Sequence, residues 1–410
     1  MKKLLLVLLI LSLFINHLNA NEKDLQIIQK DKKEYRLLDK ESIQTRQQSQ
    51  KYDWISPIDL SGNIGRNHSF SDENSRNLNN KNTKSASIGF TQSIFESGGI
   101  GFKMDYADNR FKYEMLSWEN QNSQLIYTIY NTLLDIKKLN LEINQNDYRI
   151  VNKDIELIIK KIQYEAGKTD IIELNNAIMS KNLILKEEIA LKNSLKEKEQ
   201  ELAKYTDLKY DEIEILDFQE TNKDIFLDKN YSILEADAKV EMLNSEYKIK
   251  KSQYLPKLSL SAKASYSNQD EKFNSMINDT NKDDASSSGS LILSMPLYDY
   301  TKSSKIQESK IEVLKQKALV NDLKNETAFE YEQIFTKIDT YLKQNETINK
   351  NIKLYEELIG ANKISSEAGM TSKYDLEILE NTKTINEFDI LINKINILQQ
   401  YAKLYFKIKN

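Results

Sequence analysis

The sequence predicts a mainly α-helical protein that also carries membrane β-strands, built twice from one plan of long α-hairpins with four β-strands per chain. Three observations predict this fold. The turn Glu-Ala-Gly-x-Thr at 165–169 recurs at 367–371, almost half of the 410-residue chain later. Long segments without proline carry apolar residues spaced three and four apart, as helices do. Shorter segments alternate apolar and polar residues, as strands do. A repeated order of this kind indicates a duplicated protein.

The composition favours long helices and excludes several functions. The chain has 3 prolines, 10 glycines and no cysteine, so disulfides, thiol nucleophiles, thiolate metal sites and lipid-modified cysteines are excluded. With 58 basic and 62 acidic residues, its net charge of −4 does not suit a general nucleic-acid binder. The only histidines are His17 and His68. No nucleophile–base pair, phosphate loop or metal-ligand cluster is visible, so we expect no enzyme, cofactor or metal site.

Residues 1–20 have the pattern of a cleavable signal peptide. Lys2 and Lys3 precede an apolar run at 4–15 that is short for a bilayer span, and Ala20 offers a small residue at the cleavage point. The alternative is an uncleaved membrane anchor. The pattern predicts that the protein leaves the cytoplasm.

The first repeat, residues 21–204, begins with a polar, proline-free segment at 22–50 that favours a helix. Apolar residues then alternate with polar ones on both sides of an Asn/Ser/Asp-rich segment at 66–84, which predicts a β-hairpin at 54–96 with a polar loop. A helix follows from about 101 to 163. At ~1.5 Å per residue it forms a rod of roughly 95 Å.

The apolar seam of this rod is built from spacings of three and four, as a coiled coil requires. Its members are Ile126, Ile129, Leu133, Ile136, Ile143, Ile150, Ile158 and Ile162. Gly167 allows the positive φ that reverses the chain at the tip, residues 165–170. Thr169 or Asp170 then caps a second helix that returns to about Lys204.

A mixed, acidic segment at 205–230 predicts a partly helical link, and the plan then repeats. The second repeat, residues 231–410, is predicted to contain a helix (231–253), a β-hairpin (258–298) with a polar loop (268–288), a helix (301–365), a turn (367–372) and a helix (372–408). The repetition favours one duplicated architecture over several globular domains.

Four strands of membrane-spanning length cannot form a stable open sheet in lipid, because the edge N–H and C=O groups stay unsatisfied at several kcal/mol each. The strands therefore lie outside a membrane, or several chains pool them into a closed barrel. Three chains would supply 12 strands, enough for a barrel wide enough to form a channel. The sequence does not decide whether the helical seams pack within one chain or between chains.

The chain resembles the TolC family of outer-membrane efflux and secretion channels. The resemblance covers nearly all of the predicted mature chain. It rests on the duplicated plan, on Tyr254-Leu255-Pro256 before a strand, on Met295-Pro296-Leu297-Tyr298-Asp299 after one, and on two Ala-Gly turns, each followed six residues later by an acidic residue. The sequence departs from the family at Ile55-Ser56-Pro57, where relatives have Leu-Pro, and it lacks the lipidated cysteine of many relatives.

The resemblance implies a homotrimer in the outer membrane, with a 12-stranded β-barrel in lipid and an α-helical barrel in the periplasm. It also implies two partners, a periplasmic adaptor (membrane fusion) protein and an inner-membrane transporter of RND or ABC type. The expected function is the exit duct of a tripartite efflux or type I secretion system. The alternative is a periplasmic coiled-coil scaffold or adaptor without a pore, in which residues 58–96 and 258–298 form small soluble domains.

The resemblance also implies site residues. In the family, the acidic residue six positions after the second turn glycine lines the periplasmic entrance, which is Asp375 here, and Glu173 holds the equivalent place in the first half. Three copies of Asp375 would form an acidic ring that favours cations and could bind a divalent one. The alternative is ordinary solvated helix carboxylates. Relatives often add an aspartate where this chain has Ile378, which weakens any ring.

The hairpin tips are the expected adaptor contacts, with the glycines needed first for the turns. The tip residues are Ala166, Gly167, Lys168, Thr169, Ala368, Gly369, Met370 and Thr371. Aromatic residues near the strand ends suit the membrane interfaces or, equally well, packing against neighbouring strands. These residues are Trp54, Phe95, Tyr266 and Tyr298.

Overall fold

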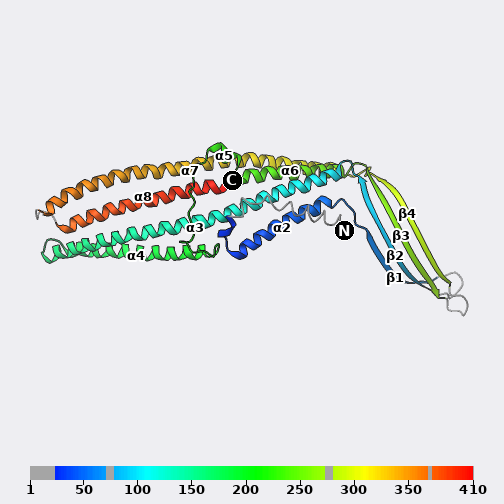
Figure 1. Ribbon diagram of the computed structural model, residues 1–410, viewed down its shortest axis with the longest axis horizontal. Helices are drawn as coiled ribbons and strands as arrows, with labels where there is room; N and C mark the ends of the chain where they lie inside the picture. The colour runs from blue at the N-terminus through cyan, green and yellow to red at the C-terminus, as the bar shows by residue number, and fades with distance from the viewer. Residues whose placement is uncertain (1–23, 71–77, 273–279, 368–371, 410) are drawn as a thin grey trace, which may run out of the picture. The chain divides into compact units, whose positions relative to one another are not determined.

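The computed structural model describes residues 24–70, 78–272, 280–367 and 372–409, and the chain divides into two compact units (Figure 1). The sheet unit comprises residues 41–115 and 235–320. The helical unit comprises the described part of 1–40, 116–234 and 321–410. Each unit takes segments from both halves of the chain. The compact units therefore cut across the two sequence repeats, whose boundaries stay a prediction.

Helices make up most of the described chain, which confirms the mainly helical class. Apart from the short 3-10 helix η1 (Asp24–Ile27), the helices are α2 (Lys30–Tyr52), α3 (Gly99–Glu165), α4 (Ile171–Leu202), the short α5 (Lys223–Asp228), α6 (Tyr231–Ser252), α7 (Lys302–Glu367) and α8 (Lys373–Lys407). The three prolines lie outside them, at Pro57, Pro256 and Pro296. Without proline or a glycine-rich break, nothing in α3 or α7 interrupts the backbone hydrogen-bond ladder.

The sheet unit contains one four-stranded antiparallel sheet. Its strands are β1 (Asp59–Phe70), β2 (Leu78–Phe95), β3 (Lys257–Lys272) and β4 (Thr280–Ser294). They lie in the order β1-β2-β3-β4, so the predicted hairpins are joined through a β2–β3 pair that the sequence did not specify. The first hairpin packs beside the second, and β1 and β4 form the edges.

The strands are longer than the sequence predicted. The polar segments 66–84 and 268–288 were expected to be loops, but β1 continues to Phe70, β2 begins at Leu78, and the second hairpin extends in the same way. The prediction failed because it relied on apolar alternation. A β-ladder is formed by backbone groups, and it can continue where polar side chains occupy both faces and the alternation disappears.

The helical unit arranges its long helices in one layer, in the order α4, α3, α8 and α7 (Figure 1). Polar contacts join each neighbouring pair: Lys181 Nζ with Asp154 Oδ1 (2.5 Å) between α4 and α3, Gln145 Nε2 with Asp389 Oδ1 (2.6 Å) between α3 and α8, and Asn393 Nδ2 with Asn345 Oδ1 (2.9 Å) between α8 and α7. The central pair, α3 and α8, therefore joins the first half of the chain to the second.

The predicted apolar seam of α3 is buried over only part of its length. Ile129, Leu133 and Ile136 are fully buried, whereas Ile158 is 41% exposed and Ile162 54% exposed. The part of the seam from Ile129 to Ile136 therefore belongs to the buried core of the helical unit. Toward the hairpin turn the seam leaves apolar surface that one chain does not cover.

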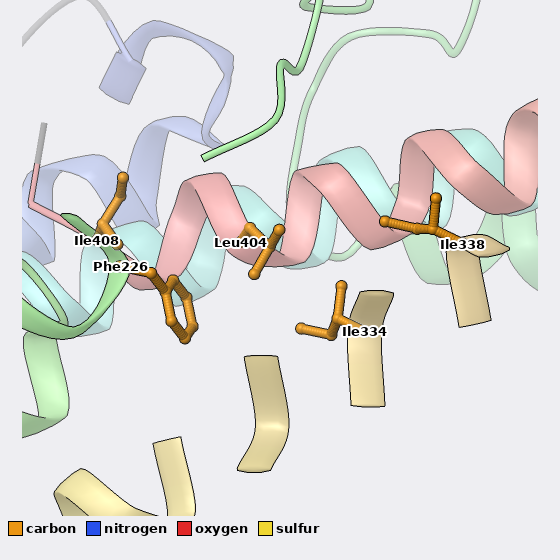
Figure 2. Packing of buried hydrophobic residues seen from close by; sticks show 5 residues of the cluster. All are labelled: Phe226, Ile334, Ile338, Leu404 and Ile408. Carbon is orange, nitrogen blue, oxygen red and sulfur yellow. The ribbon is translucent and has the colours of Figure 1, made fainter. Parts of the chain in front are cut away.

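A second core cluster fills the space between α5, α7 and α8 (Figure 2). It consists of Phe226, Ile334, Ile338, Leu404 and Ile408. Just beyond α5, Asn230 forms an isolated β-bridge with Ile408, and the Lys409 N–H donates to the Lys229 carbonyl at 2.8 Å. The link between the halves is therefore packed into the helical unit and holds the end of α8.

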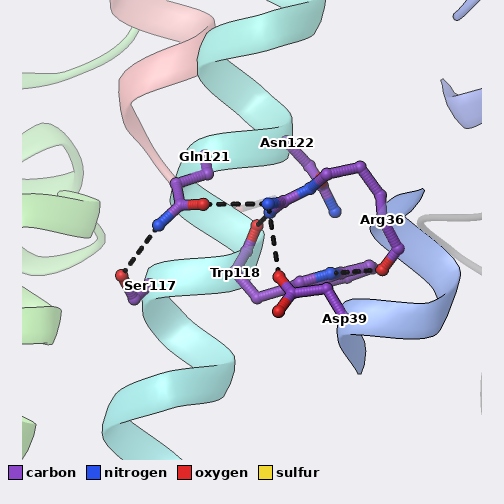
Figure 3. Close-up of polar contacts among 6 residues, drawn as sticks. All are labelled: Arg36, Asp39, Ser117, Trp118, Gln121 and Asn122. Carbon is purple, nitrogen blue, oxygen red and sulfur yellow. Dashed lines mark hydrogen bonds and ion pairs between the residues drawn. The ribbon is translucent and has the colours of Figure 1, made fainter. Parts of the chain in front are cut away.

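A buried polar cluster attaches α2 to α3 (Figure 3). Arg36 donates from Nε to Asn122 Oδ1 (2.6 Å) and from its terminal nitrogens to Gln121 Oε1 and the Trp118 carbonyl, both at 2.9 Å. In return, Trp118 Nε1 donates to the Arg36 carbonyl at 2.8 Å. The guanidinium carbon lies 5.6 Å from the centre of the Trp118 ring, within range of a cation–π contact.

Candidate functional site

The sheet has one polar face, which we call the serine face. Alternation along each strand and the register between strands place four serines in one row, in which Ser61 pairs with Ser87, Ser87 with Ser265, and Ser265 with Ser286. Hydroxyl oxygens meet across the strands at 2.8 Å for Ser61 and Ser87 and 2.8 Å for Ser265 and Ser286. Cross-strand hydroxyl pairs of this kind stabilise a sheet and leave a hydrophilic surface.

The opposite face carries a continuous apolar band. Its members in the described strands are Leu60, Gly62, Ala86, Ile88, Phe90, Phe95, Leu258, Leu260, Ala262, Ala264, Tyr266, Ala285, Leu291 and Leu293. Along β3 the band runs from Leu258 to Tyr266, about the 9–11 residues with which a tilted strand crosses a bilayer. Beyond Tyr266 the same face turns polar, with Lys84, Asn268 and Asp283 in the next row. The band therefore has the height of a membrane.

Two polar side chains, Gln92 and Ser287, lie inside this band, and the amide of Gln92 is fully satisfied. Gln92 Nε2 donates to the Trp54 carbonyl (2.9 Å) and to the Ser93 carbonyl (2.8 Å), and Gln92 Oε1 accepts from the Ser56 N–H (2.9 Å). A buried or lipid-facing amide is tolerated when its donors and acceptor are used. Gln92 thereby attaches the segment before β1 to β2.

The two edges of the sheet are open within one chain. β1 pairs only with β2, and β4 only with β3, among the described strands. Large apolar side chains on these edges are mostly exposed, at 79% for Leu60, 84% for Ile64 and 73% for Leu293. In lipid each unpaired backbone group would cost several kcal/mol, so a sheet with this band needs further strands at both edges.

Aromatic side chains stand at the two ends of the band. Tyr266 marks its loop end and is 50% exposed, while Phe95 (52%) and Tyr298 (85%) mark the end nearer the helices. Amphipathic rings are favoured at both interfaces of a membrane. Trp54, the fourth aromatic residue that the sequence singled out, is only partly exposed.

The first hairpin tip is closed by hydrogen bonds around Gly167. Its φ is +68°, in the left-handed region, and the N–H groups of Lys168 and Gly167 donate to the carbonyls of Gln163 (2.8 Å) and Tyr164 (2.9 Å). This pair of bonds is a Schellman motif. Asp170 then caps α4 by accepting from the Glu173 N–H. The predicted turn glycine and cap are therefore confirmed.

Gly167→Ala is expected to destabilise this turn by about 1–2 kcal/mol, because an L-residue resists the left-handed conformation. A Cβ there would have nothing within 4 Å, so the whole cost is in the backbone. Gly360→Ala in α7, also in open space, is the matched control and should stabilise by about 0.5–1 kcal/mol. Hydrogen exchange of the local amides measures both, and equal changes in the two variants would contradict the assigned turn.

The remaining tip residues divide between described and undescribed positions. Ala166 and Lys168 are exposed and Thr169 is partly exposed. The predicted second tip, Ala368, Gly369, Met370 and Thr371, lies outside the described residues.

The two candidate entrance carboxylates have different surroundings. Glu173 lies in the first turn of α4, and its Oε2 is 2.8 Å from Lys160 Nζ on α3, a partner that the sequence analysis missed. Asp375 lies exposed in the first turn of α8, where its N–H donates to the Ser372 carbonyl at 3.1 Å. A carboxylate in a first helical turn is favoured by the helix dipole. Their place at the entrance stays a prediction.

The sequence analysis also missed that the contact between α3 and α8 is polar near the tips. Asn381 Nδ2 donates to Asn152 Oδ1 (2.9 Å), and Gln145 Nε2 donates to the Ile385 carbonyl (2.9 Å). The sequence does contain a sign of this contact, because the amide residues Gln145 and Asn152 are seven positions apart, as residues of a helical seam are. A search for apolar residues alone does not detect it.

Other kinds of site find no support in the described ranges. Within them, no group of three or more His, Cys, Asp or Glu side chains is arranged to hold a metal ion. None of their helices combines the length and apolarity that crossing a membrane requires. The two-faced sheet and the first hairpin tip are therefore the features that carry a functional argument.

Comparisons with known proteins agree with this geometry. Residues 224–403 match the family model described as outer membrane efflux protein. The sequence matches no curated protein significantly. The structure is similar to the outer membrane protein VceC of Vibrio cholerae (TM-score 0.70, 13% identity, covering 94% of this chain and 93% of that one).

Two further solved channels are similar at the level of the fold. They are the CmeC outer membrane channel of Campylobacter jejuni (TM-score 0.67, 13% identity, 92% and 84% covered) and the MtrE outer membrane channel of Neisseria gonorrhoeae in its open state (TM-score 0.65, 11% identity, 91% and 85% covered). Residues 224–403 thus match the outer membrane efflux protein family model, and the chain has the fold of these outer membrane channels over almost its whole length.

Proposed function

We propose that the protein is an outer-membrane exit duct formed by three copies of this chain. The observation that carries the proposal is the two-faced sheet with open edges. Its apolar band has membrane height, its other face is lined with hydroxyl groups, and its edge strands lack partners within one chain. Three copies with four strands each would close a 12-stranded barrel with the apolar bands in lipid and the serine faces inside.

The helical layer supports the same assembly. Its outer helices, α4 and α7, carry large apolar side chains that are mostly exposed in one chain: Ile171, Ile172, Ile178, Met179, Leu183, Ile189, Phe329, Leu342, Leu354, Leu358 and Ile364. Exposed apolar surface on this scale indicates an interaction surface. In a trimer the outer helices of neighbouring copies would cover each other and form an α-helical barrel in the periplasm.

The proposed partners are a periplasmic adaptor protein and an inner-membrane transporter of RND or ABC type, so that the duct would serve tripartite efflux or type I secretion. The hairpin tips would contact the adaptor, because Ala166 and Lys168 are exposed beside a rigid turn. Asp375 would line the entrance beside them. Glu173, already paired with Lys160, would contribute less charge there.

Single cysteines test the proposed orientation, because the chain has none of its own. On β3, Ser261→Cys and Ser265→Cys place a thiol on the serine face, and Ala262→Cys and Ala264→Cys place one in the apolar band. In trimers reconstituted in lipid vesicles, a water-soluble maleimide should label the serine positions, and a lipid-soluble maleimide the alanine positions. Equal labelling of all four thiols, or recovery of the protein as a soluble periplasmic monomer, would favour the scaffold without a pore.

A further inference from the structure

Hydroxyl side chains predominate on the serine face, with Asn63, Gln269 and Ile292 among the exceptions. Its hydroxyl-bearing members in the described strands are Ser61, Thr83, Ser85, Ser87, Thr91, Ser93, Ser259, Ser261, Ser265, Ser267, Ser286, Ser288, Ser290 and Ser294. Further cross-strand contacts join them, with Thr91 Oγ1 and Ser261 Oγ 3.0 Å apart and Ser93 Oγ and Ser259 Oγ 3.3 Å apart. Hydroxyl groups both donate and accept hydrogen bonds, so this surface can solvate solutes of either charge.

The charges on this face cancel along the apolar band. Over the band and one row beyond it at each end, the register places two carboxylates on the serine face, Asp59 and Asp284, and two ammonium groups, Lys257 and Lys263. Asp59 and Lys263 stand in one row on either side of Gly89. These opposite charges lie two strands apart, and salt screens the field of each beyond about 8 Å at physiological ionic strength. Neither sign forms a patch of its own.

Lys81, Glu271 and Lys282 share the register of the serine face but lie farther from the helices than Tyr266, past the apolar band. Arg66, Lys84 and Asp283 lie on the opposite face at the loop end of the band, and Asp283 Oδ1 accepts from Asn268 Nδ2 at 2.6 Å. In a barrel with the apolar band in lipid, Arg66, Lys84 and Asp283 would stand outside the wall near the membrane surface. They add no charge to the serine face.

We propose that the wall of the duct within the outer membrane is neutral and hydroxyl-lined, and that it passes anionic and cationic solutes equally well. This inference rests on the proposed function, because it needs the serine face to enclose the lumen. Channels that select by charge carry rings of one sign, and the serine face has none. Any charge preference of the whole duct would then arise elsewhere, as at the proposed Asp375 entrance.

Reaction of a single thiol with charged reagents tests the inference. In Ser87→Cys trimers in lipid vesicles, a cationic and an anionic methanethiosulfonate of similar size should react at rates that differ by less than about threefold, after each rate is divided by that of a small free thiol. A charge-lined channel concentrates one sign by about 10- to 1000-fold. A corrected ratio of about tenfold or more would overturn the inference of a neutral wall, but it would not contradict the proposed function as a duct.

A second variant shows that the assay detects charge at this place. Ser265 is the cross-strand neighbour of Ser87, so Ser87→Cys/Ser265→Asp should shift the ratio several-fold toward the cationic reagent, and the uncharged Ser87→Cys/Ser265→Asn should not. An unshifted ratio in the aspartate variant would contradict the placement of Ser87 and Ser265 on the wall of the lumen. If Ser87→Cys reacts with neither reagent, the proposed function itself is contradicted, and the inference with it.

Discussion

Phe226→Ala is expected to lower the free energy of unfolding of the helical unit by about 3–5 kcal/mol, the range for removing a buried phenylalanine. The side chain is fully buried, in a cluster to which α5, α7 and α8 all contribute (Figure 2). Its ring centre is 5.6 Å from that of Tyr331 on α7. Truncation removes apolar contacts to both long helices and leaves a cavity that only a rearranged link could fill.

The loss should be local as well as large, because the link is tied to the end of α8 by the Asn230–Ile408 bridge. Amides of residues 223–230 and 404–409 should exchange with solvent about two orders of magnitude faster, the equivalent of about 3 kcal/mol. Ile225→Ala removes a large apolar side chain from the same short helix at a position that is 48% exposed and serves as the control. A loss for Phe226→Ala no greater than for Ile225→Ala would contradict the packing of the link.

The importance of Phe226 could not be predicted from the sequence. It lies in the segment 205–230, where apolar residues follow no period, and a short helix of six residues leaves too few positions to reveal a buried face. The long helices were predictable for the opposite reason. Over the 67 residues of α3, repeated spacing and the absence of proline leave one regular structure.

The candidate site was predictable in part. Strand alternation gives the two faces of each hairpin, and a glycine between helices gives the turn at Gly167, whose positive φ needs no distant partner. The serine row needs more information, because the pairing of Ser87 with Ser265 depends on the register of strands far apart in the chain. The contact of Glu173 with Lys160 likewise depends on how α3 and α4 lie against each other.

Arg36→Met is expected to destabilise the attachment of α2 to α3 by about 2–3 kcal/mol. Arg36 is 8% exposed, and its donors reach Asn122, Gln121 and the Trp118 carbonyl (Figure 3). Burial lowers the pKa of the guanidinium, and the carboxylate of Asp39 opposes that shift. Methionine keeps an apolar stem beside the indole but donates nothing, so buried acceptors lose their partners at about 1–3 kcal/mol each, with some recovered by water.

The matched control lies on the same helix. Arg46→Met removes the ion pair of Arg46 with Glu114, 2.9 Å long, in which the arginine side chain is 43% exposed, and a pair of that kind contributes about 1 kcal/mol or less. In a Trp54→Phe background, which leaves Trp118 as the only tryptophan, quenching of its fluorescence by a water-soluble quencher should rise in Arg36→Met and stay unchanged in Arg46→Met, because only the first substitution lets water reach the buried indole. Equal quenching in both variants would mean that the indole is shielded by packing alone. The hydrogen bonds of Arg36 would then contribute little to holding α2 in place.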